Sequence, residues 1–338
     1  MFFAPDGIRA FAETAVDELR RCPQRLLGLG LFWAWLQLVF VISSDTPVFQ
    51  GTTFDSHNQT WMLSLLVSVA TVLCIFIRSK RIDALADGRT YLLATHLTMT
   101  LGTLALAATV WLPMQKSLVL IGIALTGIGS AAAFVAWGKQ LAHLALRSVL
   151  FNMAACAFIV AIVYLVATLL PLPARQAIAT LLPLVSGTLL TRAPQDPLNI
   201  SKPMRHQSAA EHVFSFDLMV LIVLVGFSFG MIRAMTFGHL ASSMQQLTLA
   251  TVVGIAIAGT LLLATAAVFK KSNHLYLVSQ ISLPLLAAGF LLIPLVSTAF
   301  PWPAVIFGVG HNYFYSLLWV LYVDQSRQED RSAVAVFA

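Results

Sequence analysis

The strongest constraint in this sequence is a series of long apolar stretches separated by short polar breaks. The hydrocarbon core of a bilayer requires roughly 20 apolar residues for each spanning helix, and we count about ten such stretches. The predicted spans are residues 26–43, 61–77, 91–112, 117–137, 148–170, 176–191, 216–236, 244–269, 275–299 and 303–323. Backbone polar groups inside lipid must be paired within their own segment, and the sequence lacks the alternating pattern of a β-barrel. We therefore predict an all-α integral membrane protein.

The distribution of basic residues predicts the orientation of these spans. Hydrophobic residues make up 59% of the chain and charged residues only 10%, which excludes a soluble domain. With a cytoplasmic N-terminus, all but Lys116, Arg175 and Arg233 of the 20 Lys and Arg residues fall on the inner side. This asymmetry follows the positive-inside rule. It predicts a multi-pass membrane protein whose N-terminus lies in the cytoplasm.

Polar segments divide the chain into two halves. Residues 192–215 contain three prolines and no apolar run, which indicates a cytoplasmic linker between an N-terminal half, 26–191, and a C-terminal half, 216–324. Residues 1–25 predict a cytoplasmic or interfacial leader helix, with a merely solvated leader as an equal alternative. Residues 325–338 turn from charged to apolar, which indicates the start of an incomplete further helix.

This layout resembles the major facilitator superfamily, in which two six-helix halves enclose a central cavity. The loop sequence LADGR (85–89) also resembles the loop signature of that superfamily, in a shortened form without its leading glycine. The resemblance implies a twelve-helix fold. We therefore expect about ten transmembrane helices, six and four, of a truncated major-facilitator-like domain.

The last predicted span concentrates polar and aromatic side chains on one helical stripe. His311, Tyr315 and Trp319 recur at i, i+4 and i+8, so they point the same way on an α-helix. A similar stripe with Ser130 and Phe134 follows a Gly-x-Gly about half a chain earlier. Such spacings also occur by chance in apolar helices. We interpret the stripe as one wall of a binding site.

Polar groups inside two other spans add to this candidate site. Gln37 lies one turn after Trp33 in the first span, and a buried amide needs a partner or water. Arg233 lies in the seventh span, where a charge costs roughly 2.5–3.5 kcal/mol on insertion scales and usually marks a pathway. Two alternatives stay open. Arg233 could reach the outer interface by snorkelling, and His96 in the third span could serve helix packing rather than a ligand.

Together these side chains predict a cavity between the two halves that binds a small molecule. The indole and phenol rings suit an aromatic ligand, and Arg233 suits a carboxylate or another anion. The predicted ligand-binding residues are Trp33, Gln37, Ser130, Phe134, Trp137, Arg233, His311, Tyr315 and Trp319.

The sequence carries no motif for enzymatic chemistry. Its three cysteines, Cys22, Cys74 and Cys156, form no disulfide framework or metal motif, and no nucleotide-binding loop or catalytic grouping occurs. Every acidic residue is expected in a loop or at a helix end. This disfavours a proton-driven pump, because proton relays commonly use a carboxylate within the membrane. We predict no enzyme activity, no metal and no cofactor.

A closer resemblance is carried by GLFWAWLQLVF (30–40), GIGSAAAFVAWGK (127–139), GFSFGMIRA (226–234) and GHNYFYSLLWVLYVDQ (310–325). In this order they resemble the membrane portion of bacterial LuxR-type regulators, in which a facilitator-like domain precedes a helix-turn-helix. The resemblance implies a small-molecule sensor in the bacterial inner membrane that regulates transcription through an attached DNA-binding domain. No helix-turn-helix pattern occurs in this chain, so we expect no nucleic-acid binding by these residues. The alternative is a facilitator-type secondary transporter of a small organic, anionic solute.

Overall fold

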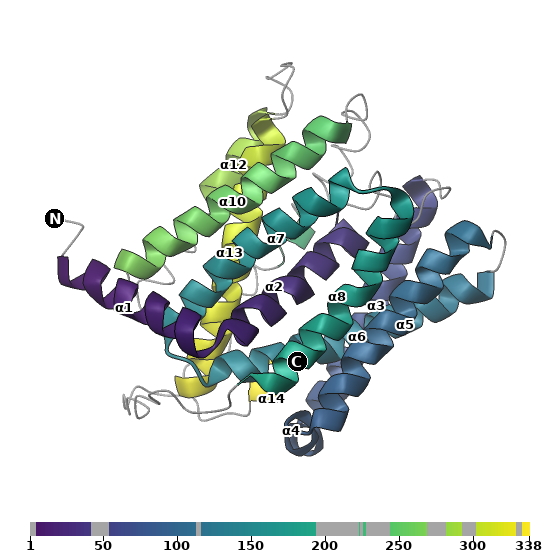
Figure 1. The fold of residues 1–338 in the computed structure, drawn as a ribbon, viewed down its shortest axis with the longest axis horizontal. Helices are drawn as coiled ribbons and strands as arrows, with labels where there is room; N and C mark the ends of the chain where they lie inside the picture. Colours follow the sequence, from purple (N-terminus) through teal and green to yellow (C-terminus); the bar gives the residue numbers. More distant parts are fainter. Residues whose placement is uncertain are drawn as a thin grey trace.

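Long helices run side by side through the described parts of the chain (Figure 1). The computed structural model describes residues 5–41, 54–112, 116–193, 223, 226–227, 244–268, 282–292, 302–328 and 333–338. Within these ranges the secondary structure is almost entirely helical, which confirms the predicted all-α class.

The two halves contribute the following helices. The leader holds α1 (Pro5–Arg21), and the N-terminal half has α2 (Pro23–Leu36) with a π-helical continuation (Gln37–Val41), α3 (Phe54–Ile77), α4 (Ser79–Ala86), α5 (Arg89–Trp111), α6 (Lys116–Ala142), α7 (Leu146–Leu169) and α8 (Leu172–Arg192). The C-terminal half has α10 (Met244–Val268), α12 (Ser282–Leu292), α13 (Trp302–Gln328) and the short α14 (Ala333–Phe337). Each predicted span overlaps one of these helices except 216–236, which lies almost wholly outside the described residues.

Six of the described helices are long and apolar enough to cross a membrane. Their spans are Thr60–Ile77, Arg89–Trp111, Lys116–Ala142, Leu146–Leu169, Thr248–Ala267 and Trp302–Arg327. A helix of 20 residues is about 30 Å long, which matches the hydrocarbon thickness of a bilayer. The chain is therefore a multi-pass membrane protein.

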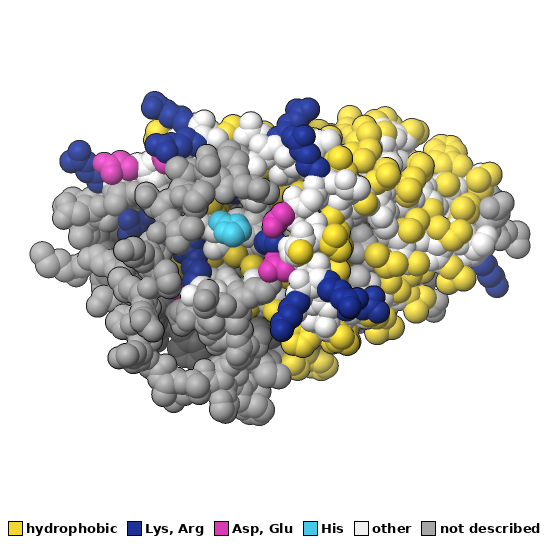
Figure 2. Space-filling model, turned by 90° about the horizontal axis from the view of Figure 1, so that it is seen from below, with side chains coloured by type: hydrophobic (Ala, Val, Ile, Leu, Met, Phe, Trp, Pro, Cys, Tyr) yellow, Lys and Arg dark blue, Asp and Glu magenta, His cyan; other side chains and the backbone are white. Residues whose placement is uncertain are grey.

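The outer face of α3 indicates which environment surrounds the helix bundle. Large apolar side chains stand exposed along it. They are Met62, Leu63, Leu65, Leu66, Val69, Leu73, Phe76 and Ile77. Figure 2 shows a broad hydrophobic surface over one part of the molecule, while most of the visible charged side chains gather elsewhere. A continuous apolar surface of this kind is unfavourable in water but is the expected exterior of a helix bundle in lipid.

The helix α7 joins the two halves. It packs against α2 on one side and α10 on the other (Figure 1). The approach to α10 is close because the facing residues are small. A Cβ placed on Gly259 of α10 would lie 3.1 Å from the Cβ of Ala157 on α7. The helix α13 packs against α6 and α7 of the N-terminal half. It also packs against α10 and α12 of its own half.

The helix α1 lies within the leader predicted for residues 1–25. Its charged face carries an exposed ion pair between Arg21 and Asp17, with 2.6 Å between Nε and Oδ1. Another face turns Phe11 toward Phe151 of α7, with ring centroids 6.1 Å apart. Because α1 also contacts α10, this helix touches both halves.

The predicted boundaries of the halves lie partly outside the described residues. The helix α8 ends at Arg192, where the predicted linker 192–215 begins, and the linker after residue 193 is outside the described part. At the other boundary α13 continues past the predicted end of the tenth span to Gln328. Within the segment 325–338, predicted as the start of a further helix, the structure places the short α14.

Candidate functional site

Four of the predicted site residues meet where the two halves face each other. The ring centroid of Trp33 on α2 lies 4.9 Å from that of Tyr315 and 5.7 Å from that of Trp319, both on α13. Phe134 on α6 lies 4.4 Å from Trp319 by the same measure. These contacts are edge-to-face, an arrangement that the quadrupoles of aromatic rings favour. We call Trp33, Phe134, Tyr315 and Trp319 the aromatic junction.

The stripe on α13 continues from the junction toward the start of that helix. His311 stacks with Phe307 and with Tyr315, its ring centroid 6.0 and 6.1 Å from theirs. The spacing of His311, Tyr315 and Trp319 thus places them on one face, as the sequence predicts. Phe307 in turn meets Phe290 of α12 at 5.7 Å. The column of rings therefore connects α13 both to the N-terminal half and to its own half.

Unpaired polar atoms are buried along this aromatic surface. The indole Nε1 atoms of Trp33 and Trp319 have no hydrogen-bond partner among the described residues, and neither has the amide Oε1 of Gln37. Trp319 is 1% exposed and Gln37 is 8% exposed. Leaving a buried polar group unpaired costs roughly 1–3 kcal/mol, so proteins normally pair such groups. Gln37 also begins a π-helical turn, a feature frequent at functional sites. A bound molecule could satisfy all three atoms.

The helix α14 covers one end of the junction with a ring that the sequence analysis did not single out. The ring centroid of Phe337 lies 5.3 Å from that of Trp319, 5.5 Å from that of Tyr322 and 6.2 Å from that of Phe134. The ring fits because residue 138 of α6 is glycine, and a Cβ there would clash with it. In the sequence, the apolar residues 333–338 follow a charged segment. This apolar run is the signal that could have located the Phe337 ring.

Arg327 links the same end of α13 to the N-terminal half. Its guanidinium donates hydrogen bonds to the backbone carbonyls of Ala142, at 3.1 Å, and Leu144. These carbonyls lie at the end of α6, where the helix itself provides no partner. Arg327 and Phe337 therefore join the two halves at the end of the bundle where α14 lies.

Comparison with known proteins identifies the fold. No protein-family model matches the chain, and no curated protein matches its sequence. The crystal structure of the human organic anion transporter MFSD10 (TETRAN) matches with a TM-score of 0.61 and 14% sequence identity. The match covers 95% of this chain and 90% of that one.

This chain has the major facilitator fold. At this level of identity the likeness establishes the fold alone, and it confirms the prediction of a major-facilitator-like helical membrane domain. The comparisons give no support to the resemblance to LuxR-type regulators, which stays a prediction.

The loop that resembles the facilitator signature carries an ion-pair cluster. The Lys139 ammonium lies 2.8 Å from a carboxylate oxygen of Asp83 and 3.0 Å from one of Asp87. Lys139 also donates a hydrogen bond of 2.7 Å to the backbone carbonyl of Asp83. These contacts hold α4 and the turn before α5 against the end of α6.

A second polar cluster lies where α1, α2 and α7 meet, and the sequence analysis missed it. Oε2 of Glu18 lies 3.6 Å from Nη1 of Arg25, and both side chains are almost fully buried. Asn152 donates a hydrogen bond of 3.3 Å to Glu18, and Arg25 donates one of 3.0 Å to the sulfur of Cys22. Burial raises the pKa of the Cys22 thiol, and the nearby Arg25 charge opposes this shift. We call Glu18, Cys22, Arg25 and Asn152 the ionic cluster.

Four predicted site residues, Gln37, Ser130, Trp137 and Arg233, do not join the aromatic junction through a described contact. The Ser130 hydroxyl lies 3.3 Å from that of Ser68 on α3. Trp137 is fully buried, with its ring against Gly28 of α2. Both side chains therefore pack inside the N-terminal half, and their role toward a ligand stays a prediction. Arg233 lies outside the described residues.

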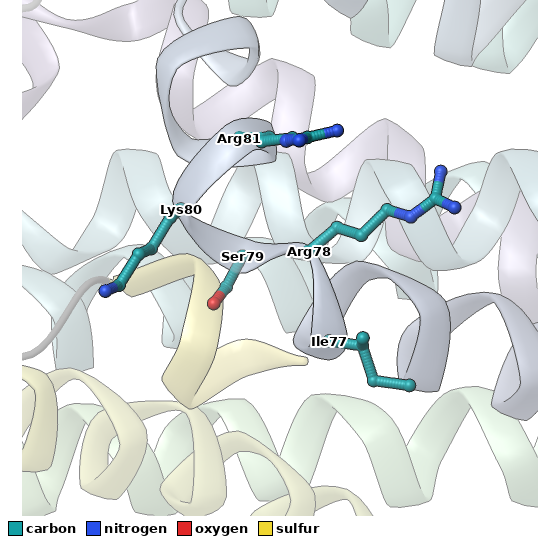
Figure 3. Close-up of a pocket in the computed structure, with 5 residues that line it drawn as sticks. All are labelled: Ile77, Arg78, Ser79, Lys80 and Arg81. Carbon is teal, nitrogen blue, oxygen red and sulfur yellow. The ribbon is translucent and has the colours of Figure 1, made fainter.

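Two surface hollows lie away from the junction. One, of about 410 Å³, lies at the turn between α3 and α4 (Figure 3). Its lining consists of Ile77, Arg78, Ser79, Lys80 and Arg81. Lys80 points to one side of this turn while Arg78 and Arg81 point to the other, so the charges do not converge on one anion. The second hollow, of about 440 Å³, lies between α3 and α6 and is lined by apolar side chains such as Leu66 and Ile123. The junction is therefore the better candidate for a specific ligand.

Proposed function

We propose that this chain moves a small aromatic organic solute across a membrane as a facilitator-type secondary transporter. The observation that carries the proposal is the aromatic junction, which lies where α2 and α6 of one half meet α13 of the other. In transporters of this fold the substrate site lies between the two repeats near the bilayer midplane, and the repeats rock around it.

The contacts at the α14 end support one closed state of such a cycle. Phe337 covers the junction, and Arg327 bridges α13 to the turn after α6. Both contacts are made by side chains, so they can separate without the unfolding of a helix. The basic residues predict a cytoplasmic N-terminus, which makes this end the inner one. The proposed solute would then enter the junction from outside.

The solute class follows from the residues of the site and from the related fold. Indole and phenol rings suit an aromatic solute. Arg233, predicted in the seventh span, suits an anion, and the solved structure with this fold is named an organic anion transporter. These two observations extend the proposal to organic anions. No catalytic step, cofactor or metal is part of it.

A second candidate is the membrane-embedded sensor of a LuxR-type regulator, which rests on the motif resemblance alone. A sensor would bind its ligand at the same junction and change conformation without net flux, to an extent set by its difference in affinity for two states. We favour transport because the matching solved structure is itself named a transporter.

Uptake of radiolabelled 2-naphthoate by proteoliposomes that contain the purified chain tests the proposal. We expect saturable uptake above that of protein-free vesicles, and its loss in Trp319→Ala. The variant Leu66→Ala, on the exposed face of α3, should keep the uptake. Binding without uptake would favour the sensor instead. Absence of both binding and uptake in a folded chain would contradict both candidates.

A further inference from the structure

We infer that the aromatic junction recognises hydrogen-bond acceptors on the edge of a flat aromatic ligand, rather than the ligand's charge. The inference rests on the proposed function, since it concerns what the same site binds. It names the ligand class as planar aromatic carbonyl compounds, neutral or anionic, whose oxygen faces the indole N–H groups of Trp33 and Trp319.

Two indole donors stand close together in the junction. The ring centroids of Trp33 and Trp319 are 5.7 Å apart, and their planes are inclined at 64°. Neither Nε1 has a partner among the described residues, and Trp319 is almost completely buried. An indole N–H only donates, so its complement must be an acceptor. Each of the two donors therefore calls for an acceptor on the ligand, such as a carbonyl or a carboxylate oxygen.

Gln37 adds the opposite kind of group. Its Oε1 has no partner in the described part of the chain and accepts rather than donates. It lies one turn after Trp33, or about 6 Å along the helix axis, at the start of the π-helical continuation of α2. A ligand N–H or O–H group on that side would satisfy it. An amide substituent holds both an acceptor for an indole N–H and a donor for Gln37.

The remaining surface of the junction selects for shape and not for charge. Phe134 and Tyr315 present ring edges and faces to Trp319 and Trp33. The side chains of the four junction residues and of Gln37 carry no formal charge. A flat ring system can take the place of the present ring contacts, because aromatic rings pack against it in the same edge-to-face manner. Recognition by these residues therefore depends on a flat shape and on acceptor atoms.

Three probes with the same ring system vary the charge and the acceptor atoms. The compound 2-naphthamide is neutral and has an acceptor, 2-naphthoate is an anion with acceptors, and 2-naphthylmethylammonium has no acceptor. Isothermal titration calorimetry on the purified full chain in detergent compares their binding. We expect the amide and the carboxylate to bind within a few-fold of each other. The ammonium should bind at least about ten-fold more weakly than the amide. It loses both hydrogen bonds from the indole N–H groups, and each bond contributes up to about a factor of ten in affinity.

Two variants test the donors themselves. Trp319→Phe and Trp33→Phe keep an aromatic ring and remove the N–H, so each should weaken 2-naphthamide binding about three- to ten-fold. Each variant should also reduce the ratio between the affinity for the amide and the affinity for the ammonium. The matched control is Trp35→Phe on the same helix as Trp33, since that N–H already donates to Thr103 at 2.9 Å. It should leave both affinities unchanged. Helical circular dichroism and a monodisperse elution profile confirm that each variant is folded.

Two results would overturn the inference while transport stands. One is strong binding of 2-naphthoate with no binding of 2-naphthamide, which would show recognition of charge. The other is an equal loss of affinity for all three probes in Trp319→Phe, which would show that ring area alone matters. If no probe binds and no 2-naphthoate enters proteoliposomes, the inference and the proposed function both fail.

Discussion

The aromatic junction and the ionic cluster stabilise neighbouring parts of one bundle by opposite physical means. The junction brings uncharged rings of the two halves together, and its buried indole N–H groups have no hydrogen-bond partner in the described part of the chain. The ionic cluster buries opposite charges of Glu18 and Arg25 against each other, with Asn152 donating a hydrogen bond to Glu18 and Arg25 donating one to Cys22. Ring contacts can be exchanged for contacts with a ligand at little cost, whereas a buried charge cannot lose its partner cheaply. The difference indicates that the junction can open while the ionic cluster holds.

The largest effect is expected when one charge of the ionic cluster is removed. Arg25→Met leaves the Glu18 carboxylate buried without its partner, which costs about 3–5 kcal/mol of unfolding free energy. Thermal unfolding followed by circular dichroism in detergent measures the loss. The double variant Glu18→Gln/Arg25→Met removes both charges and should recover most of the stability. If Arg25→Met unfolds at the wild-type temperature, the ion pair is not buried and the comparison fails.

A smaller effect on stability, but a larger one on access, is expected at Phe337. Phe337→Ala removes a buried ring at a cost of at most about 3 kcal/mol, since α14 can detach locally while the bundle remains folded. We expect a cysteine introduced at position 134 to react about ten-fold faster with an impermeant thiol reagent in this variant. A ten-fold increase in the population with α14 detached corresponds to about 1.4 kcal/mol. The matched control is Phe290→Ala, at the far end of the ring column. Equal acceleration by both variants would show that α14 does not cover the junction.

A hydrogen bond inside one half should matter for stability and not for transport. The Ser186 hydroxyl of α8 donates a bond of 2.8 Å to the carbonyl of Gly28 on α2. Ser186→Ala should lower the unfolding free energy by about 0.5–1.5 kcal/mol and leave 2-naphthoate uptake unchanged. Thr188→Ala, whose hydroxyl bonds within its own helix, serves as the control. Reduced uptake in Ser186→Ala at full stability would mean that the N-terminal half does not move as one unit.

The smallest expected effect is a pH dependence of the stability, which arises from the Cys22 thiol. Burial raises the pKa of this thiol, so the folded chain retains a proton that the unfolded chain releases in alkaline solution. The resulting stabilisation is complete below the ordinary thiol pKa and is lost as the pH rises through the folded pKa. Wild type should therefore lose more thermal stability than Cys22→Ala between pH 7 and pH 10. Identical pH profiles would show that the Cys22 thiol does not contribute to the pH dependence of stability.

The rings of the junction could be predicted because they depend on local spacing. His311, Tyr315 and Trp319 repeat at one helical turn, and any α-helix aligns such residues. The ionic cluster could not be found in this way. Glu18 and Asn152 lie far apart in the chain, and charges in a leader ordinarily indicate a solvated surface. Their burial depends on how α1 packs across α2 and α7, which no local pattern encodes.

The stripe on α6 shows a second limit of prediction from spacing. Ser130 and Phe134 lie one turn apart, yet Ser130 meets Ser68 of α3 while Phe134 meets Trp319 of α13. Because helices cross at an angle, one face of a long helix meets different neighbours at different heights. Spacing gives the face of a helix but not the neighbour at each height.

The sequence leaves His96 open between packing and ligand binding, and an observation supports each alternative, because its Nε2 is buried with no hydrogen-bond partner among the described residues while the rest of the ring is packed. The side chain is fully buried, and its Nδ1 lies 2.8 Å from the carbonyl of Leu92 on its own helix. A Cβ on Gly187 of α8 would lie 2.5 Å from the imidazole ring, so α5 and α8 approach closely at this point. The sequence alone could not show that Gly187 packs against the ring of His96.

The most direct test locks the halves together at the α14 end. Cysteines replace Ala142 and Arg327, which are joined in the structure, in a chain whose three native cysteines are serine. A short cross-linker that a reductant cleaves then bridges the pair in proteoliposomes. We expect cross-linking to abolish 2-naphthoate uptake and reduction to restore it. Undiminished uptake by the fully cross-linked chain would contradict a transport cycle in which the halves separate at this end.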